Sequence, residues 1–145
     1  MAVDVLTEIF IDRPIAEVAA FAADPSHALD WYVNIQTVEW ITPPPLAVGS
    51  QVAFVAHFLG RRLAYTYEIR VFEPCVRLVM STADGPFPME TTYTWAAEGT
   101  GTRMTLRNRG EPAGFSVLLA PFMARMMRRA NAADLVSLKW ALEEG

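Results

Sequence analysis

The sequence is poor in the residues that build disulfides, metal clusters and basic binding surfaces. It contains one cysteine, so neither an intrachain disulfide nor a thiolate metal cluster can form. There are 12 Lys and Arg residues and 16 Asp and Glu residues, so the net charge is −4 when the two histidines are neutral. Nucleic-acid-binding domains rely on basic surfaces. This balance therefore argues against a nucleic-acid partner.

The sequence also lacks the segments that direct a chain to or across a membrane. Residues Met1–Asp4 do not form the basic start of a signal peptide, and no apolar block follows them. No apolar run approaches the roughly 18 residues that a membrane-spanning helix needs. Together with the lone Cys75, these features predict a cytoplasmic protein without stable membrane insertion.

Apolar residues are abundant in this chain. They make up 52% of the 145 residues, whereas charged residues make up 19%. Disordered chains have few apolar residues and high charge, so this composition excludes disorder. The length is sufficient for a single domain over residues 1–145 with a sizeable core.

The hydrophobic periodicity predicts an α+β fold built on one antiparallel sheet. Alternation over Val3–Ile11 indicates a strand, and helical spacing then runs from Ile15 to the Asp24-Pro25 pair. A second short helical piece is expected over Ser26–Trp31. The later runs predict six more strands at Ile35–Thr42, Gln51–Leu59, Leu63–Phe72, Val76–Ala83, Met89–Ala97 and Arg103–Asn108. Short turns join them, so we expect a continuous curved sheet of about seven strands.

The alternation within the strands assigns the two faces of this sheet. The apolar face is expected to carry Leu63, Tyr65, Tyr67, Ile69, Val71, Val76, Leu78, Met80, Met104 and Leu106. Polar residues occupy the opposite parity, so the sheet covers a partner on one side only. In Gln51–Leu59 two apolar parities compete, and the direction of His57 stays open.

The C-terminal third, Gly114–Glu143, is predicted to form a long amphipathic helix. Its apolar side would carry Phe122, Met123, Met126, Met127, Ala130, Leu138 and Ala141, and its polar side Arg125, Arg128, Arg129, Lys139 and Glu143. Pro121 fits near a helix start, so we expect a short turn or helix at Phe115–Ala120 and the main helix from about Pro121. Such a helix needs an apolar surface, which the sheet supplies.

Three polar residues interrupt the apolar side of this helix. Asp134 falls near its middle, with Asn131 and Ser137 beside it. A carboxylate on an apolar face must be paired, hydrogen-bonded or protonated, because burying it alone costs several kcal/mol. We interpret the three residues as polar contacts in the wall of a ligand cavity. The alternative is a group near the rim that bonds a strand, the solvent or the helix backbone.

Aromatic and flexible side chains on the apolar faces are further candidates for ligand contact. They are Tyr65, Tyr67, Tyr93, Trp95, Met123 and Met127. Tyrosine and tryptophan rings combine large apolar area with a polar group, and methionine adapts to irregular shapes. Ordinary core packing is the alternative for each of them.

Several stretches along the whole chain carry a resemblance to a known family. They are Ile11–Val18, Ala23–Pro25, Trp31, Leu46–Ser50, Tyr67–Pro74 and Gly101–Thr105. In this order they resemble the SRPBCC superfamily of START and birch-pollen-allergen-like proteins, and more narrowly its polyketide cyclase/dehydrase branch. The predicted order of strand, two short helices, six strands and long C-terminal helix is the helix-grip arrangement of that superfamily.

The resemblance implies a deep apolar cavity between the sheet and the C-terminal helix. It places Trp31 near the mouth of this cavity, with packing between the short helices and the sheet as the alternative. Members of the superfamily bind lipids, polyketides and other hydrophobic small molecules, and some are enzymes. They share no catalytic motif, so the resemblance gives no residue of this chain a catalytic role.

Three functional hypotheses follow. The first is the binding of a hydrophobic small molecule, of lipid, polyketide or aromatic type, in the cavity. The second is a polyketide cyclase/dehydrase-type enzyme that acts by positioning its substrate, with Asp134, His57 or a tyrosine moving protons. The third is a protein-binding module like the co-chaperone relatives of the fold, which would have little interior volume.

The sequence shows no motif for a metal ion or an organic cofactor. Its only histidines, His27 and His57, lie thirty residues apart without a close carboxylate spacing, which is a poor pattern for a metal site. We therefore expect neither kind of group. The oligomeric state stays open, a homodimer included.

Overall fold

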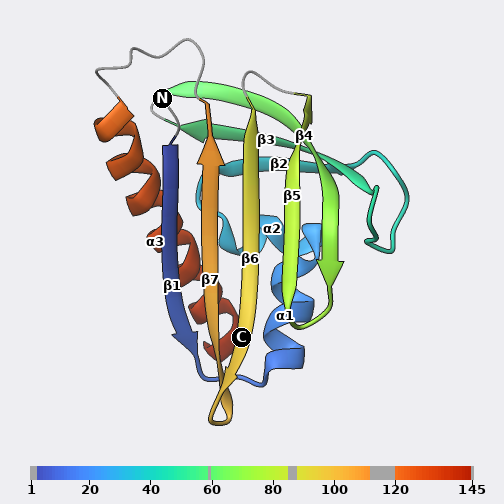
Figure 1. Ribbon diagram of the computed structural model, residues 1–145, viewed down its shortest axis with the longest axis vertical. Helices are drawn as coiled ribbons and strands as arrows, with labels where there is room; N and C mark the ends of the chain where they lie inside the picture. The colour runs from blue at the N-terminus through green and yellow to red at the C-terminus, as the bar shows by residue number, and fades with distance from the viewer. Residues whose placement is uncertain (1–2, 59, 85–87, 112–119, 145) are drawn as a thin grey trace.

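The computed structural model describes residues 3–58, 60–84, 88–111 and 120–144. A seven-stranded antiparallel sheet has the strand order β1-β7-β6-β5-β4-β3-β2, and a long helix packs on one face of it (Figure 1). The elements are β1 (Val3–Ile11), α1 (Ile15–Ala23), η1 (Pro25–His27), α2 (Ala28–Trp31), β2 (Ile35–Trp40), β3 (Gln51–Phe58), β4 (Arg61–Glu73), β5 (Arg77–Asp84), β6 (Met89–Glu98), β7 (Gly101–Gly110) and α3 (Ala120–Glu144). This is the helix-grip fold predicted from the order of elements.

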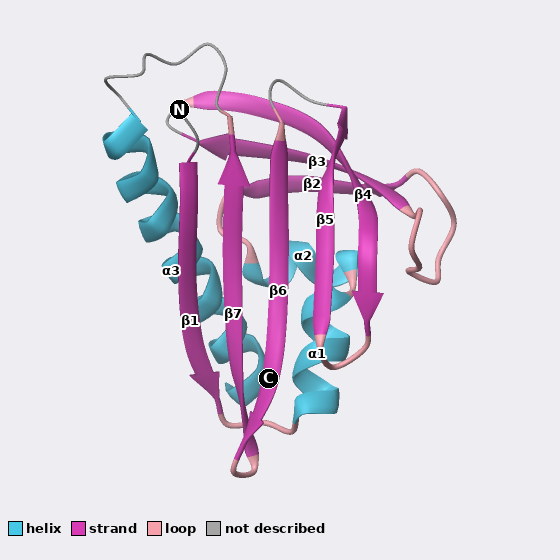
Figure 2. Ribbon diagram, viewed as in Figure 1, coloured by secondary structure: helices cyan, strands magenta, loops and turns pink. Residues whose placement is uncertain are grey.

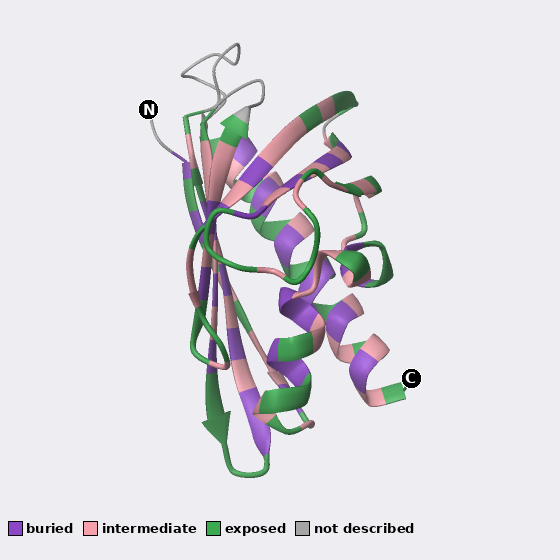
Figure 3. Cartoon of the chain, turned by 90° about the vertical axis from the view of Figure 1, so that its right-hand side faces the viewer, coloured by how far each residue is buried: buried purple, intermediate pink, exposed green. Residues whose placement is uncertain are grey.

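All helices lie on the same side of the curved sheet. Figure 2 shows α3 beside β1, the short helix α1 at the lower part of the sheet and α2 near its middle. Figure 3 shows the resulting two layers, with buried residues between them. The larger core cluster includes Ile11, Val18, Trp31, Leu78, Leu106, Leu135 and Leu138, each at most 2% exposed. No helix in the described ranges is both long enough and apolar enough to span a membrane.

Polar bonds fix the C-terminal end of α3 to the end of β1. The Arg13 side chain donates to the carbonyl oxygens of Leu142 at 3.0 Å and Glu143 at 2.8 Å. Lys139 donates from Nζ to the carbonyl oxygen of Phe10 at 2.9 Å. Cations at a helix C-terminus satisfy carbonyl groups that have no partner within the helix. The long helix is therefore held in register along the sheet.

The predicted alternation is confirmed over most of the sheet, and the inner face carries buried Tyr67, Leu78 and Met104. In β3 the competition of parities is resolved, since Phe54 is buried and His57 is exposed. The prediction for Val71 is wrong, and the reason is a β-bulge.

The register of β4 against β5 shifts between Ile69 and Val71. Val71 then pairs with Val79 on the outer parity, whereas Phe72 pairs with buried Leu78 and packs against the core. An extra residue in one strand reverses the faces of all residues beyond it. The apolar face of β4 therefore ends at Ile69 and resumes at Phe72.

Val76 also departs from the prediction, because it is 55% exposed and precedes β5. It belongs to a tight turn, in which its N–H donates to the carbonyl oxygen of Glu73 at 2.9 Å. Cys75, in the same turn, has a φ of 65° and packs half-buried against the core. Val76, which the sequence pattern assigned to the start of the strand, therefore lies in the turn, and β5 begins at Arg77.

Helix α3 begins at Ala120, so Pro121 lies near its start as expected. The rest of the expected turn at Phe115–Ala120 lies outside the described residues, as do Gly114 and Leu59. Phe122, assigned to the apolar side, is 51% exposed. The buried stripe begins at Met123 and continues at Met127, and Phe122 is rotated about 100° from it toward solvent.

Candidate functional site

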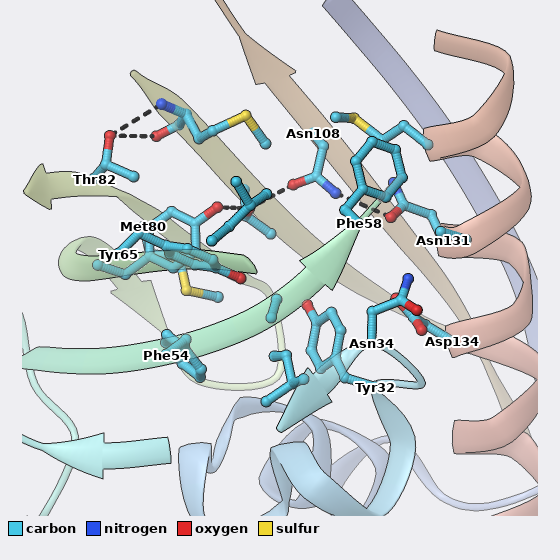
Figure 4. Close-up of a pocket in the computed structure, with 18 of the residues that line it drawn as sticks. Tyr32, Asn34, Phe54, Phe58, Tyr65, Met80, Thr82, Asn108, Asn131 and Asp134 are labelled. Carbon is cyan, nitrogen blue, oxygen red and sulfur yellow. Dashed lines mark hydrogen bonds between the residues drawn. The ribbon is translucent and has the colours of Figure 1, made fainter. Parts of the chain in front are cut away.

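A cavity of about 130 Å³ lies between the concave face of the sheet, the segment after α2 and the first half of α3 (Figure 4). At roughly 30 Å³ of liquid volume for each water molecule, this volume corresponds to about four waters. Its apolar wall is formed by Ile35, Phe54, Ala56, Phe58, Leu63, Met80, Met89, Met123, Met127 and Ala130. Its polar or phenolic groups come from Tyr32, Asn34, Tyr65, Tyr67, Thr82, Thr91, Tyr93, Asn108, Asn131 and Asp134.

Most of the candidate residues from the sequence line this cavity. They are Tyr65, Tyr67, Tyr93, Met123, Met127, Asn131 and Asp134. On α3 the four residues recur at intervals of four, four and three, which places them on one face of the helix. The strands contribute tyrosines from the inner parity of β4 and β6. The structure thus brings seven candidates from three distant segments to one space.

Three other candidates lie elsewhere. Ser137 is half-buried, one turn beyond Asp134, and does not line the cavity. Trp31 borders a separate void of about 20 Å³, which shares with the cavity the residues Tyr32, Phe54, Tyr67, Met80 and Tyr93. Trp95 borders a groove of about 490 Å³ against α1. Both tryptophans are nearly fully buried, and neither indole N–H has a partner in the described part of the chain.

A chain of hydrogen bonds crosses the sheet and reaches α3 (Figure 4). Tyr67 bonds Thr91 at 2.8 Å, Thr91 donates to Asn108 Oδ1, and Asn108 Nδ2 donates to Asn131 Oδ1 at 3.1 Å. Because the single Thr91 hydrogen is used toward Asn108, Tyr67 is the donor of the first bond. Burial raises the pKa of Tyr67 to about 12, although its bond to Thr91 acts in the opposite direction.

The hydrogen-bond chain ends in a donor without a partner. The Nδ2 atom of Asn131 is buried and has no hydrogen-bond partner among the described residues. A buried donor that stays unpaired costs about 1–3 kcal/mol. An acceptor atom of a bound molecule would remove this cost.

Asp134 is the most unusual group in the wall, since only 4% of its surface is exposed. Its Oδ1 accepts a hydrogen bond from the Val33 N–H at 2.9 Å. Its Oδ2 has no partner within the described residues. Burial raises the pKa of Asp134 to about 7, although the bond from Val33 acts in the opposite direction. This carboxyl group can therefore both give and take a proton near neutral pH.

Tyr32 and Tyr93 form a hydroxyl–hydroxyl hydrogen bond in the cavity wall. Burial is the largest cause that raises the pKa of each, and the nearby Asp134 charge adds to it. Burial also raises the pKa of Tyr65, with contributions from Tyr67, Tyr93 and Asp134. The four phenols are therefore neutral at physiological pH. They offer the cavity aromatic faces and uncharged hydroxyl groups.

Sequence reasoning missed several polar residues of the wall. Asn108 continues the inner parity of Met104 and Leu106, so a polar residue on an apolar face marks it. In the same way, Thr91 is a polar residue on the inner parity of β6, two residues before Tyr93. Tyr32 and Asn34 lie between α2 and β2, where no periodic pattern indicates their direction.

The histidines do not belong to the cavity. His27 stacks on Phe21 and bonds Asp30 at 3.0 Å, and His57 is exposed on the outer face of β3. In the ranges that the structure describes, no three His, Cys, Asp or Glu residues gather as a metal site. Among the described residues of the cavity wall, Asp134 and the phenols are the groups that can exchange a proton.

Comparisons with known proteins place this chain in a family. Residues 2–143 match the family described as polyketide cyclase / dehydrase and lipid transport. No curated protein matches the sequence. A protein from Thermus thermophilus is 21% identical, with a TM-score of 0.82 over 94% of each chain.

Two further solved structures share the fold. A START superfamily protein from Mycobacterium smegmatis is 11% identical, with a TM-score of 0.83 over 97% of each chain. The Zhui aromatase/cyclase from Streptomyces is 16% identical, with a TM-score of 0.79 over 99% of this chain and 95% of that one. The fold and the family match agree, and this chain belongs to the polyketide cyclase/dehydrase and lipid transport family of the SRPBCC superfamily.

Proposed function

We propose that the protein binds a hydrophobic small molecule in the cavity between the sheet and α3. The observation that carries this proposal is the cavity itself, with a wall of aromatic rings and methionines and a few polar groups that converge on it. Ligand sites have this composition, because apolar walls provide affinity and a few polar groups fix orientation. Family membership supports the proposal, since the family description names polyketides and lipids.

The volume favours a compact ligand. A cavity of about 150 Å³ can hold benzene, so a volume of about 130 Å³ suits a small ring compound, whereas a long-chain lipid would extend beyond it. The rings of Phe54, Tyr65 and Tyr67 contact one another with centroids 5.1–5.9 Å apart. Aromatic faces at this spacing suit an aromatic or alicyclic ligand.

A polyketide cyclase/dehydrase-type reaction is the second candidate. It is favoured by Asp134, whose pKa of about 7 suits proton transfer, and by the hydrogen-bonded pair of Tyr32 and Tyr93. An incubation with a linear poly-β-ketone tests it. Cyclised product above the uncatalysed background, lost in Asp134→Asn, would establish the enzyme. A protein-binding module is less favoured, because it predicts little interior volume.

Native mass spectrometry of the purified protein tests binding without prior choice of a ligand, because it reveals a co-purifying small molecule. The direct test is calorimetric titration with naphthalen-2-ylmethanol, a neutral two-ring alcohol. Ala56 is buried in the cavity wall on β3, so Ala56→Phe should fill the space and weaken binding at least tenfold. Ala53 lies on the opposite face of β3, and Ala53→Phe is the matched control that should bind like the wild type. Equal binding by both variants would refute the cavity as the site.

A further inference from the structure

The cavity wall has an unusual charge composition. Asp134 is the one group among its described residues that can carry a charge near neutral pH, since burial raises the pKa of all four tyrosines. None of the described residues that form the wall is arginine, lysine or histidine. Ionised Asp134 would thus face an apolar space without a compensating cation. A buried unpaired charge is strongly unfavourable, so the empty cavity favours the neutral acid.

The geometry of Asp134 leaves one oxygen available to a ligand. Oδ1 is occupied by the Val33 N–H, which also fixes the carboxyl group against the segment after α2. Oδ2 has no partner among the described residues, and the residue lines the cavity (Figure 4). The chain thus holds the carboxyl group in place by one oxygen and leaves the second oxygen to a ligand.

The surroundings of this oxygen suit a positive group. The phenol rings of Tyr32, Tyr65 and Tyr93 lie close enough to Asp134 for its charge to raise their pKa values. Aromatic faces attract cations through the ring quadrupole, most strongly where water is excluded. Phenol oxygens also accept hydrogen bonds from an ammonium group.

Given the binding function proposed above, on which this step depends, we propose that the ligand is a small aromatic or alicyclic amine, bound as its ammonium ion against Asp134. The ammonium group would donate to Oδ2, and the ring would lie among the aromatic side chains. One ligand would then fill the apolar void of the empty cavity and give the second oxygen of Asp134 a partner. The same wall would reject fatty acids, because their carboxylate would lie near Asp134 without any cation.

Proton linkage follows from this pairing. In the free protein at a pH below about 7, Asp134 is mainly protonated. An ammonium ion favours the ionised form, so binding in that range releases a proton. Amine affinity should therefore rise as the pH increases through 7, until the amine loses its own proton. A neutral alcohol should show no such dependence.

Three ligands with the same naphthalene ring test the proposal by calorimetry: naphthalen-2-ylmethylamine, naphthalen-2-ylmethanol and 2-naphthoic acid. At pH 8 the wild type should bind the amine at least tenfold more tightly than the alcohol and the acid most weakly. Between pH 8 and pH 6 the amine affinity should fall about tenfold, because the ionised fraction of a group with a pKa of about 7 falls by that factor.

Asp134→Asn should reduce the amine-to-alcohol affinity ratio to near one while alcohol binding is kept. Asp30→Asn, which removes an exposed carboxylate from α2, is the matched control and should keep the ratio. Equal amine and alcohol affinities in the wild type, or a preference that survives in Asp134→Asn, would overturn the amine proposal and leave the binding function intact. If none of the three ligands bound the wild type, or all bound Ala56→Phe unchanged, the binding function would fail as well.

Discussion

The two halves of α3 face different interiors. Toward the C-terminus, Leu135 and Leu138 are at most 1% exposed and pack in the main core cluster. Toward the N-terminus, Met127 and Asn131 are also buried, yet they border the cavity. The change of chemistry occurs between adjacent residues, Asp134 and Leu135. One helix thus packs into the core with one half and, in the proposed function, contacts the ligand with the other.

The difference in residue type matches the difference in role. Leucine side chains have few rotamers and fill a solid core, whereas methionine adapts to irregular space. Asn131 and Asp134 keep polar groups at the cavity. Among the described residues, Asn131 Nδ2 has no partner, and Asp134 accepts its bond from Val33 on Oδ1. Unsatisfied polar groups are costly in a core. They are useful in a wall that a ligand completes.

Truncation of one side chain from each half should show the largest contrast. Leu138→Ala should lower the free energy of unfolding by about 2–5 kcal/mol, because it opens a void in close-packed surroundings. Met127→Ala should cost less, about 1 kcal/mol, because this side chain already borders empty space. Urea unfolding of both variants measures the contrast. Equal losses would mean that the two halves are packed alike.

Asp134, in the N-terminal half of α3, should dominate the pH dependence of stability near neutral pH. The folded-state pKa of Asp134, about 7, exceeds the roughly 3.9 of an unfolded chain, so the folded protein binds the extra proton between these values. Its contribution is therefore complete below about pH 4 and is lost as the pH rises toward 7. The loss is on the order of 4 kcal/mol.

Urea unfolding at a series of pH values from 4 to 8 tests this dependence. Asp134→Asn should flatten the profile relative to the wild type, and Leu138→Ala should keep the wild-type slope at lower stability. An identical slope in Asp134→Asn would place the titration elsewhere.

The hydrogen-bond chain in the cavity wall should show the smallest effect. Thr91→Val leaves the Tyr67 hydroxyl and the Asn108 carbonyl oxygen without their shared partner, at a cost of about 1–3 kcal/mol. Thr92 is adjacent on the outer parity of β6, so Thr92→Val is the matched control and should change stability by less than about 0.5 kcal/mol. Thermal unfolding measures both. A loss in Thr92→Val equal to that in Thr91→Val would contradict the assignment.

Much of this arrangement could be predicted from the sequence. The order of elements identified the fold, because regular alternation and turn residues are local signals. Asp134 and Asn131 were recognised because polar residues interrupt an apolar stripe whose direction the helix period fixes. The tyrosines of β4 and β6 followed from the same kind of argument, with period two in place of 3.6.

Other features had no local signal. The bulge near Val71 depends on how β4 pairs with β5, which alternation within one strand cannot show. Tyr32 and Asn34 reach the cavity from a loop, whose direction tertiary packing decides. Trp95 has the expected parity but lies lower on β6, where α1 rather than α3 covers the sheet. The alternation along a strand shows which face a residue occupies, but it does not show which helix covers that part of the face.

The hydrogen bonds from Tyr67 to Asn131 all run in one direction, and this direction can be reversed. If the two amide groups rotate by half a turn, Asn131 donates to Asn108, Asn108 to Thr91 and Thr91 to the Tyr67 oxygen, over the same atom positions. Asn131 then presents a carbonyl oxygen to the cavity in place of an N–H. The wall can thus exchange a donor for an acceptor without backbone motion. A site of this kind adapts its polarity to the ligand while its shape stays constant.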